Sequence, residues 1–405
     1  MPKTNNIPEV RFAGVTDAWE QRKLGEVATY RRGSFPQPYG KSEWYDGDGA
    51  MPFVQVADVS DEMNLVEETK QKISILAQPM SVFAEKNSVL VTLQGSIGRV
   101  AIMQYGAFVD RTVLIFEKYK AEIDKTFWAY IIKQKFIDEA RKAPGGTIKT
   151  ITKEALSDFD LSIPKYQEQK QIGAYFRNLD NLITLHQRKY ERLKNVKKSM
   201  LEKMFPKNGS NIPEIRFAGF TDAWEQRKLS DLIIEYKETV DSDCTLPVLT
   251  SSKTEGVVLQ EEHFGRVQNH DITGYNILPR NYCTYRNRSD GVDFTFNINR
   301  CCDKGIISKF YPVFYGNNSD IFFISMVLNY CDEVVHEIAY TCTGTGQKVL
   351  SFLDLQKMNI RVPSYDEQKK ISQYFEQLDN LITLHQRKLE KLQNIKKSML
   401  EKMFV

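Results

Sequence analysis

The sequence LDNLITLHQRK occurs twice, at residues 179–189 and again at residues 378–388. Each copy lies within a longer pattern that ends in KKSMLEKMF, at residues 197–205 and 396–404. Around both copies, seam positions alternate at spacings of four and three residues, which is the pattern of a coiled coil. We therefore expect two long helices that pair with each other. The seam positions are Ile172, Phe176, Leu179, Ile183, His186, Tyr190 and Leu193 in the first copy, and Ile371, Phe375, Leu378, Ile382, His385, Leu389 and Leu392 in the second.

Each predicted helix is long and has a wide apolar stripe. A helix over residues 167–204 would measure about 55 Å at 1.5 Å per residue. Additional apolar residues widen the stripe beyond the seam, so each helix is expected to meet more than one partner helix. These residues are Leu182, Leu185, Val196, Leu381, Leu384 and Ile395.

Two histidines, His186 and His385, occupy matching seam positions. A polar residue in a seam can fix the register and the number of strands at some cost in stability. The plainer interpretation is that both histidines lie at the edge of the seam. A metal site is not expected, because no second ligand lies one helical turn away.

The composition indicates a soluble protein with more than one domain. A chain of 405 residues is too long for one ordinary core. The net charge is only +3, so any affinity for nucleic acid must come from local patches. The sequence contains neither a signal peptide nor an apolar run long enough for a membrane span. The six cysteines form no CxxC pair, which favours free thiols in a cytoplasmic protein over a zinc site or a disulfide framework.

A second repeated stretch opens each half of the chain. Residues 7–24 read IPEVRFAGVTDAWEQRKL, and residues 212–229 read IPEIRFAGFTDAWEQRKL. A period of about 200 residues is far longer than a solenoid unit and indicates a duplicated domain. The predicted segments are 1–165, an opening with a variable block; 166–206, a helix; 207–364, a linker with the second opening and block; and 365–405, the second helix.

The variable blocks, 27–164 and 232–363, differ in sequence but have a similar organisation. In each block, predicted strands precede a helical pattern, which is followed by a glycine-bearing loop and a short closing strand. The expected helices span 125–141 and 319–336, the loops 144–151 and 343–350, and the third strand of the first block 112–119.

These patterns predict an α/β (α+β) fold class. The chain would contain two domains of similar fold, separated by a long antiparallel two-helix coiled coil and related by a pseudo-two-fold internal repeat. Antiparallel pairing is expected because two identical helices of one chain would be related by a two-fold axis.

Catalytic motifs are missing from the sequence. There is no GxGxxG, no complete GxxxxGK[ST], no HExxH and no [DNS]PP[YF] tetrapeptide of the kind that adenine methyltransferases use. A stand-alone methyltransferase or nuclease would need such motifs. The sequence therefore favours a binding protein without catalytic residues or bound metal.

Basic, amide and hydroxyl side chains gather on predicted turns of both blocks. Arg, Lys, Asn and Gln can contact base edges, while Ser, Thr and loop amides can hold phosphates. For any one of these residues an ordinary exposed role remains open, and the signal lies in their clustering on turns. The candidates are Arg31, Arg32, Gln94, Ser96, Arg99, Thr147 and Lys149 in the first block, and Tyr285, Arg286, Asn287, Arg288, Gln347 and Lys348 in the second.

Over essentially its whole length, the chain resembles the specificity subunit of type I restriction–modification systems. The resemblance rests on DAWEQRKL in each opening, on GSIGRVAI at residues 95–102, on the EQ pairs that follow Pro164 and Pro363, and on the LDNLITLHQRK…KKSMLEKMF helices. One departure is the sequence Tyr365-Asp366-Glu367 at the start of the second helix, where capping is expected to differ.

The resemblance implies two target recognition domains, each reading one half of an asymmetric bipartite site in double-stranded DNA. It implies that the helices set the spacing and dock two methyltransferase subunits, with restriction/translocase subunits as further partners. It implies no cofactor in this chain; S-adenosylmethionine, ATP and Mg would belong to the partners. The alternative is a coiled-coil scaffold that joins two protein-binding modules without contacting DNA.

Overall fold

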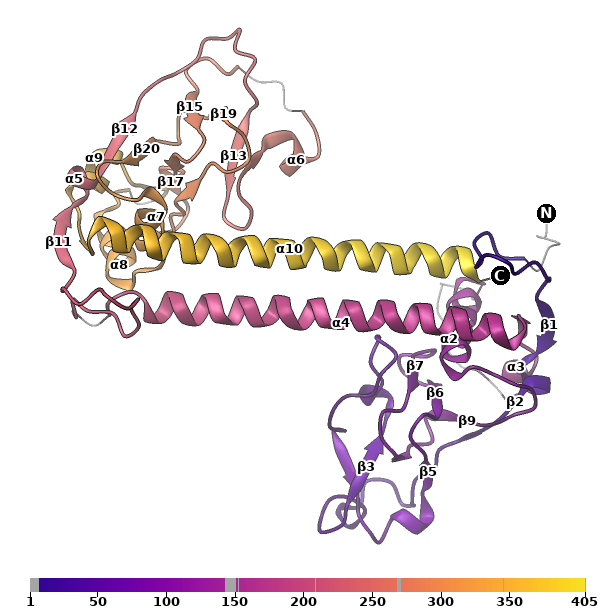
Figure 1. Cartoon of the computed structure of the whole chain (residues 1–405). Helices are drawn as coiled ribbons and strands as arrows, with labels where there is room; N and C mark the ends of the chain where they lie inside the picture. Colours follow the sequence, from indigo (N-terminus) through magenta and orange to yellow (C-terminus); the bar gives the residue numbers. More distant parts are fainter. Residues whose placement is uncertain are drawn as a thin grey trace. The chain divides into compact units, whose positions relative to one another are not determined.

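The chain folds into two compact units (Figure 1). The computed structural model describes residues 7–142, 151, 153–207, 209–267, 271–344 and 346–404. The first unit comprises Met1–Arg188 and Gln386–Val405, and the second comprises Lys189–His385. Two long helices, α4 (Tyr166–Lys203) and α10 (Tyr365–Met403), each begin in one unit and end in the other.

Two four-stranded sheets form the body of the first unit. One has the strand order β2-β9-β6-β7 and is antiparallel throughout. The other has the order β4-β3-β8-β5, with β3 parallel to β8. Helix α2 (Lys125–Lys142) packs against β6 and β7 and buries Phe127, Trp128 and Phe136. The strands are β2 (Ala28–Arg32), β3 (Met51–Val54), β4 (Gln71–Ile73), β5 (Val82–Ala84), β6 (Val89–Thr92), β7 (Val100–Ile102), β8 (Ala107–Val109) and β9 (Val113–Tyr119).

The second unit repeats the first of these sheets. Its four-stranded sheet has the order β12-β20-β16-β18, and α7 (Ile321–Tyr330) packs against β16, β18 and β20. Three strand pairs, β13-β14, β15-β19 and β17-β21, complete the block with helix α6 (Gln260–Phe264). The strands are β12 (Ile233–Tyr236), β13 (Leu249–Ser252), β14 (Gly256–Leu259), β15 (Asn276–Pro279), β16 (Cys283–Thr284), β17 (Arg288–Ser289), β18 (Asn297–Ile298), β19 (Lys304–Ile307), β20 (Val313–Gly316) and β21 (Lys348–Val349).

The repeated opening of each half returns to the end of its own variable block. Strand β1 (Glu20–Lys23) pairs with β10 (Asp160–Ile163), and β11 (Glu225–Lys228) pairs with β22 (Asn359–Val362). The presence of DAWEQRKL in both halves is thus explained, because its EQRK forms the strand that closes each block. Four short helices flank these pairs: α1 (Leu24–Val27), α3 (Lys153–Ser157), α5 (Leu229–Leu232) and α9 (Phe352–Lys357).

A buried ion pair ties each opening to the start of a long helix. The Arg11 guanidinium donates to both carboxylate oxygens of Glu168, at 2.9 and 2.7 Å. Arg216 makes the equivalent bonds to Glu367, at 2.9 and 2.6 Å. Both glutamates belong to the EQ pairs of the sequence, so the helix starts are held alike. The expected difference in capping is present: Ser364 Oγ accepts from the Glu367 N–H at 3.4 Å, whereas the first helix has Lys165 at the matching position.

Contacts within each unit establish that α4 and α10 are antiparallel. In the first unit, Lys396 Nζ lies 2.5 Å from Asp180 Oδ1, so the end of α10 lies beside the start of α4 (Figure 1). In the second unit, Lys197 Nζ lies 2.5 Å from Asp379 Oδ1. These two ion pairs join matching positions of the repeat. They are the same contact made once in each unit.

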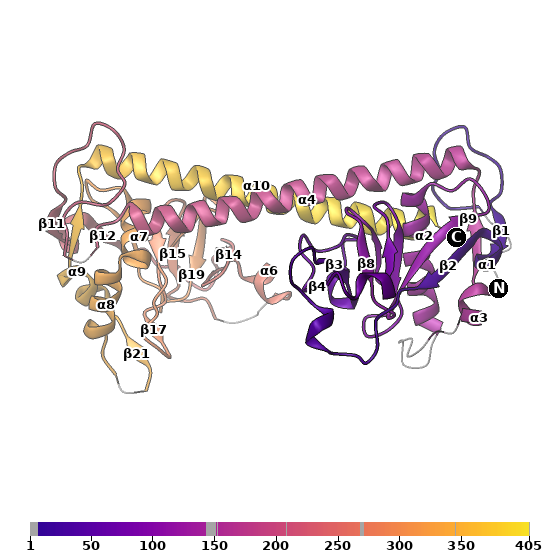
Figure 2. The same ribbon diagram turned by 90° about the horizontal axis from the view of Figure 1, so that it is seen from below.

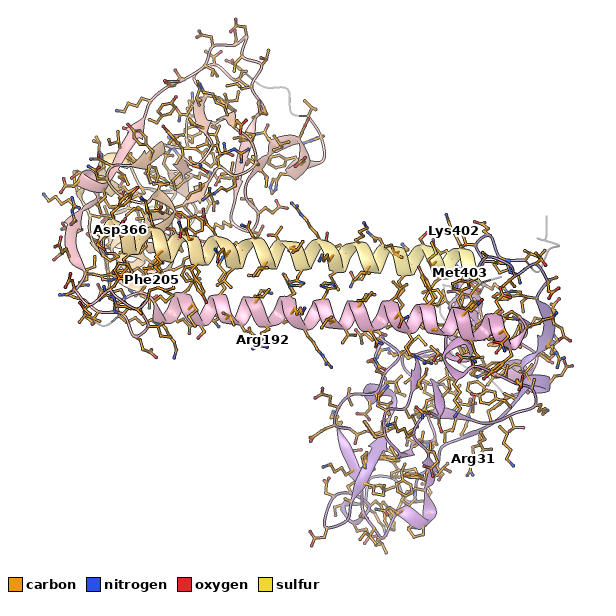
Figure 3. All side chains as sticks on the ribbon, in the orientation of Figure 1. Arg31, Arg192, Phe205, Asp366, Lys402 and Met403 are labelled. Atoms are coloured by element: carbon orange, nitrogen blue, oxygen red, sulfur yellow. The ribbon has the colours of Figure 1, made fainter. Side chains whose placement is uncertain are left out.

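The end of each long helix packs into an aromatic core; Figure 3 labels Phe205 just after α4 and Met403 at the end of α10. Phe404, after α10, stacks on Phe127 with ring centres 5.8 Å apart and meets the edge of Trp19. Phe205, after α4, stacks on Phe323 at 5.9 Å and meets Trp224. The MF that ends each copy of KKSMLEKMF is therefore part of a core rather than a frayed terminus.

The structure confirms the predicted fold class: two α/β units of similar make-up, an internal repeat and an antiparallel helix pair. One predicted element was wrong. The single helix expected over residues 319–336 is two helices, α7 and α8 (Asp332–Thr341), because Cys331 between them has extended backbone. Asp332 and Glu333 favour a new helix start, where negative charge complements the helix dipole. Among the residues described, no helix is long and apolar enough to cross a membrane.

Candidate nucleic-acid interface

In the first unit, one end of the sheet β2-β9-β6-β7 brings several turns together. Strand β6 ends at Thr92, which pairs with Val113, the first residue of β9. Strand β2 ends at Arg32, which pairs with Leu114. The residues that follow β2 and β6 and those that precede β9 are therefore neighbours.

Gln94 and Ser96 lie exposed in the turn that follows β6. Gly95 and Gly98 have φ angles of 63° and 84°, in the left-handed region that favours glycine. The Thr92 hydroxyl donates to the Ser96 carbonyl oxygen and so closes the turn. The sequence GSIG thus builds a tight turn that presents an amide and a hydroxyl side chain to solvent.

The structure adds Arg111, which sequence reasoning missed, in the turn between β8 and β9. The Asp110 carboxylate accepts hydrogen bonds from the Thr112 N–H and hydroxyl, which fixes this turn. The Leu93 N–H donates to the Thr112 carbonyl oxygen at 2.8 Å, which joins it to the turn of Gln94. A Cβ atom at Gly33 would clash with the Asp110 carbonyl oxygen, so glycine is required at this close approach. The signal that could have found Arg111 is Asp-Arg-Thr at the start of a predicted strand.

The other arginine candidates of the first block differ in their partners. Arg32 is exposed and forms no ion pair with any described residue. Arg31, which is labelled in Figure 3, has its Nε 3.7 Å from Glu117 Oε1, a loose surface contact. Arg99 Nε lies 2.9 Å from Asp61 Oδ1, so a contact between Arg99 and a base would have to replace this ion pair. Thr147 and Lys149 lie outside the described residues.

In the second unit, Tyr285 is a core residue, which contradicts its prediction as a DNA contact. Its side chain is fully buried and packs on Phe296 with ring centres 4.8 Å apart. Its hydroxyl donates to the Leu350 carbonyl oxygen at 3.0 Å, and burial raises the pKa of this phenol. Residues 283–285 are all buried and exposure begins at Arg286, a boundary that a local cluster of polar residues does not reveal.

Arg286 lines a polar cavity of about 310 Å³ together with Arg288, Lys253 and Tyr311. Burial raises the pKa of Tyr311, and the positive charge of Arg286 acts in the opposite direction. Lys253 in this cavity is bound to Asp293. Neither Arg286 nor Arg288 has a carboxylate partner in the described part of the chain.

Strand pairing brings together candidates that are about 60 residues apart in sequence. Strands β17 and β21 pair with Arg288 opposite Val349 and Ser289 opposite Lys348 (Figure 2). The Arg288 guanidinium lies 4.5 Å from the centre of the Phe310 ring, a cation–π contact that restricts its orientation. Asn287 is half-buried and its backbone binds Phe310 and Leu350. Lys348 is half-buried, and Gln347, just before β21, is exposed.

The helix seam residues divide between the two units. Ile172, Phe176 and Leu179 are buried in the core of the first unit, and Leu392 packs against that core. The matching set in the second unit is Ile371, Phe375 and Leu378, with Leu193 packed against them. The middle of each seam is half-buried, at Ile183, His186, Tyr190, Ile382, His385 and Leu389.

Four leucines of the wide stripe remain exposed. The exposed fractions of Leu182 and Leu185 on α4 are 43% and 46%, and those of Leu381 and Leu384 on α10 are 43% and 45%. Paired large apolar side chains on a helix surface are typical of a site that another protein covers. Val196 and Ile395, which were expected to widen the same stripe, pack instead against the cores.

No cluster of three or more His, Cys, Asp or Glu side chains that could hold a metal occurs in the part of the chain that the structure describes. The arrangement at the two sheet ends consists of arginines, amides and hydroxyls on tight turns. Such groups can donate hydrogen bonds to bases and phosphates.

Comparisons with known proteins identify relatives of the whole chain. The family described as type I restriction modification DNA specificity domain matches residues 16–195 and 303–394. The type I restriction enzyme MjaVIII specificity subunit of Methanocaldococcus jannaschii is 22% identical over 98% of this chain and 95% of its own length. A putative type I restriction enzyme MjaX specificity subunit of the same organism is also 22% identical, with the same coverage. The crystal structure of a type I restriction–modification S subunit from M. genitalium has a similar fold, with a TM-score of 0.62, 13% identity, and coverage of 98% of this chain and 99% of that one.

Proposed function

Because the chain belongs to the type I restriction modification DNA specificity family, we propose that it selects the DNA sequence on which a methyltransferase assembly acts. In this assembly it is the non-catalytic specificity subunit. Each unit reads one half of a bipartite, asymmetric target in double-stranded DNA. The observation that carries the proposal is the pair of corresponding sheet ends, which present exposed arginine and amide side chains on turns of different sequence.

Local charge, rather than net charge, supports contact with DNA. The chain as a whole carries only +3, yet Arg286 and Arg288 lie together without a carboxylate partner among the described residues. A cation without a carboxylate partner can bind a backbone phosphate, and this binding is favourable because it releases counterions from the DNA. An arginine at a base edge adds sequence preference. The alternative of a scaffold without DNA contact is not favoured, since it gives these side chains no role.

Exchanging one variable block for that of a relative tests this function. Residues 27–164 are replaced by the corresponding block of a relative, and N6-methyladenine is mapped across the genome of cells that contain the complex. We expect one half-site of the methylated target to change and the other to stay. The reciprocal exchange of residues 232–363 should change only the other half-site. A chimera in which both half-sites change, or neither does, would refute reading by separate units.

The helices are the proposed docking site for two methyltransferase subunits. We expect α4 and α10, which each belong to both units, to set the number of base pairs between the half-sites. Restriction/translocase subunits would join the same assembly. S-adenosylmethionine would bind to the methyltransferase subunits, and ATP and Mg to the restriction subunits.

Replacing Leu182 and Leu185 by glutamine should weaken binding of the methyltransferase subunit by more than about tenfold. A leucine that becomes fully buried contributes roughly 1.5–3 kcal/mol, and glutamine preserves helix propensity. Affinity chromatography of the assembled complex measures the effect. The matched control is Leu353→Gln, because Leu353 on α9 is 68% exposed. If the double variant retains the methyltransferase as well as this control does, the leucines are not the docking surface.

A further inference from the structure

The two variable blocks, which share little sequence, place two pairs of residues at equivalent positions. The sheets have the same strand order, with β6 and β9 in one unit corresponding to β16 and β20 in the other. Thr92 pairs with Val113, and Thr284 pairs with Val313. Two residues after these threonines lie Gln94 and Arg286. Two residues before these valines lie Arg111 and Tyr311.

Both pairs of turns are held together by comparable hydrogen bonds. In the first unit, the Leu93 N–H donates to the Thr112 carbonyl oxygen at 2.8 Å. In the second, the Thr284 hydroxyl donates to the Pro312 carbonyl oxygen at 2.8 Å, and the Asn287 N–H donates to the Phe310 carbonyl oxygen at 2.9 Å. These bonds hold the backbone of both turns before any ligand arrives, which lowers the entropic cost of binding.

Arginines that are bound to carboxylates differ from arginines whose guanidinium is available to a ligand. Many arginines of the two blocks are bound to carboxylates: Arg99 to Asp61, Arg141 to Asp138, Arg280 to Asp303, Arg300 to Glu376 and Arg361 to Glu333. Arg111 and Arg286 are exposed, and neither forms an ion pair within the described ranges. Arg32 and Arg288, which are equally unpaired, lie at the same two sheet ends. Arg266, in the loop after α6, also forms no ion pair with a described residue, but it lies away from the two sheet ends.

We propose that Arg111 and Arg286 are the base-reading arginines of the two units, each contacting a guanine in its own half-site. A guanidinium can donate two parallel hydrogen bonds to O6 and N7 of guanine in the major groove, a pattern that no other base offers. The inference rests on the proposed function and assigns its specificity to particular side chains.

The position of the cation explains how one scaffold reads two sequences. The first unit pairs Gln94 on one turn with Arg111 on the other. The second unit has Arg286 at the position of Gln94 and Tyr311 at the position of Arg111. The arginine has thus moved to the opposite turn, so guanine is contacted at a different place along the groove in each half-site.

The experiment uses the complete complex with its methyltransferase subunits. N6-methyladenine is mapped for the wild type and for Arg111→Ala and Arg286→Ala. We expect each variant to lose about tenfold to a hundredfold of its discrimination for guanine at one position of one half-site. The two variants should affect different half-sites, and thermal unfolding should be unchanged because both side chains are exposed.

Two sets of variants give the inference its controls. Arg22→Ala and Arg280→Ala remove exposed arginines that are bound to carboxylates, and both should leave the target unchanged. Arg111→Lys keeps the charge but replaces the planar, two-pronged guanidinium by a single ammonium group, so it should keep more affinity than Arg111→Ala while discrimination for guanine stays reduced.

The outcomes distinguish a failure of the proposed function from a failure of the assignment of Arg111 and Arg286. Methylation at no defined bipartite site by the wild-type complex would refute the proposed function itself. A bipartite wild-type site that stays unchanged in Arg111→Ala and Arg286→Ala would refute only the assignment of these arginines. So would uniform weakening at all sequences, because that result marks a phosphate contact.

Discussion

Replacing Trp19 by alanine is expected to destabilise the first unit by about 3–5 kcal/mol, the range measured for large aromatic residues in cores. Trp19 is 2% exposed and packs edge-on against Phe127 and Phe404, with ring centres 6.0 and 6.2 Å away. Because Phe404 directly follows α10, this cavity would also loosen the end of that helix. Hydrogen exchange measured segment by segment should show faster exchange in the first unit.

The internal repeat supplies a matched experiment for this core. Trp224 is also 2% exposed and meets Phe205 and Phe323, so Trp224→Ala should have the same effect on the second unit. The Trp19 indole N–H has no hydrogen-bond partner among the described residues. Trp19→Phe should therefore cost much less than Trp19→Ala. Tyr340→Ala is the exposed control, since Tyr340 is 90% exposed. Equal destabilisation of both units by Trp19→Ala would contradict this view of the two cores.

Glu168→Gln is expected to cost about 3–5 kcal/mol, because it leaves the buried guanidinium of Arg11 without its counter-charge. The side chains of Arg11 and Glu168 are only 9% and 3% exposed. The hydrogen bond with Glu168 raises the pKa of Arg11, so Arg11 stays charged throughout neutral pH, and its contribution to stability is lost as the pH rises through that raised pKa. Urea unfolding monitored for each unit measures the loss.

Three further variants separate the charge effect from simple packing. Glu367→Gln should reproduce the loss in the second unit, where Arg216 takes the place of Arg11. Asp17→Asn removes an exposed ion pair with Lys165 and should cost far less than Glu168→Gln, because solvent screens this pair. The double variant Arg11→Met/Glu168→Leu removes both charges and should recover much of the stability lost in Glu168→Gln. If Glu168→Gln behaved like Asp17→Asn, the ion pair would not be a structural anchor of the helix start.

Much of the fold could be predicted because the same helix pattern occurs twice in the sequence. The spacing of Ile172, Phe176 and Leu179 identifies a helix seam, and a second copy at the same spacing identifies its partner. The variable blocks were harder to predict. Their strands are as short as two residues, as in β16. The second sheet of the first unit, β4-β3-β8-β5, was not predicted. Strands this short carry little periodicity, since their existence depends on partners distant in the sequence.

The candidate site was predicted only in part. Gln94 and Ser96 were found because glycines mark their turn, and Arg286 and Arg288 because they cluster. Arg111 was missed because it stands alone between two strands. Of the residues selected from sequence, Tyr285 was wrong as a DNA contact, and Arg99 is bound to Asp61. Neither burial nor ion pairing with a residue 38 positions away can be read from a local pattern.

The sequence by itself determined the duplication, the two long helices and their pairing, because helical periodicity is a local property that repeats along the chain. Only the tertiary structure decided which turns meet at the sheet ends, which arginines remain without a carboxylate, and which cores receive Phe205 and Phe404. These features depend on hydrogen bonds and packing between residues far apart in the chain, and such contacts form only when the strands and helices are assembled.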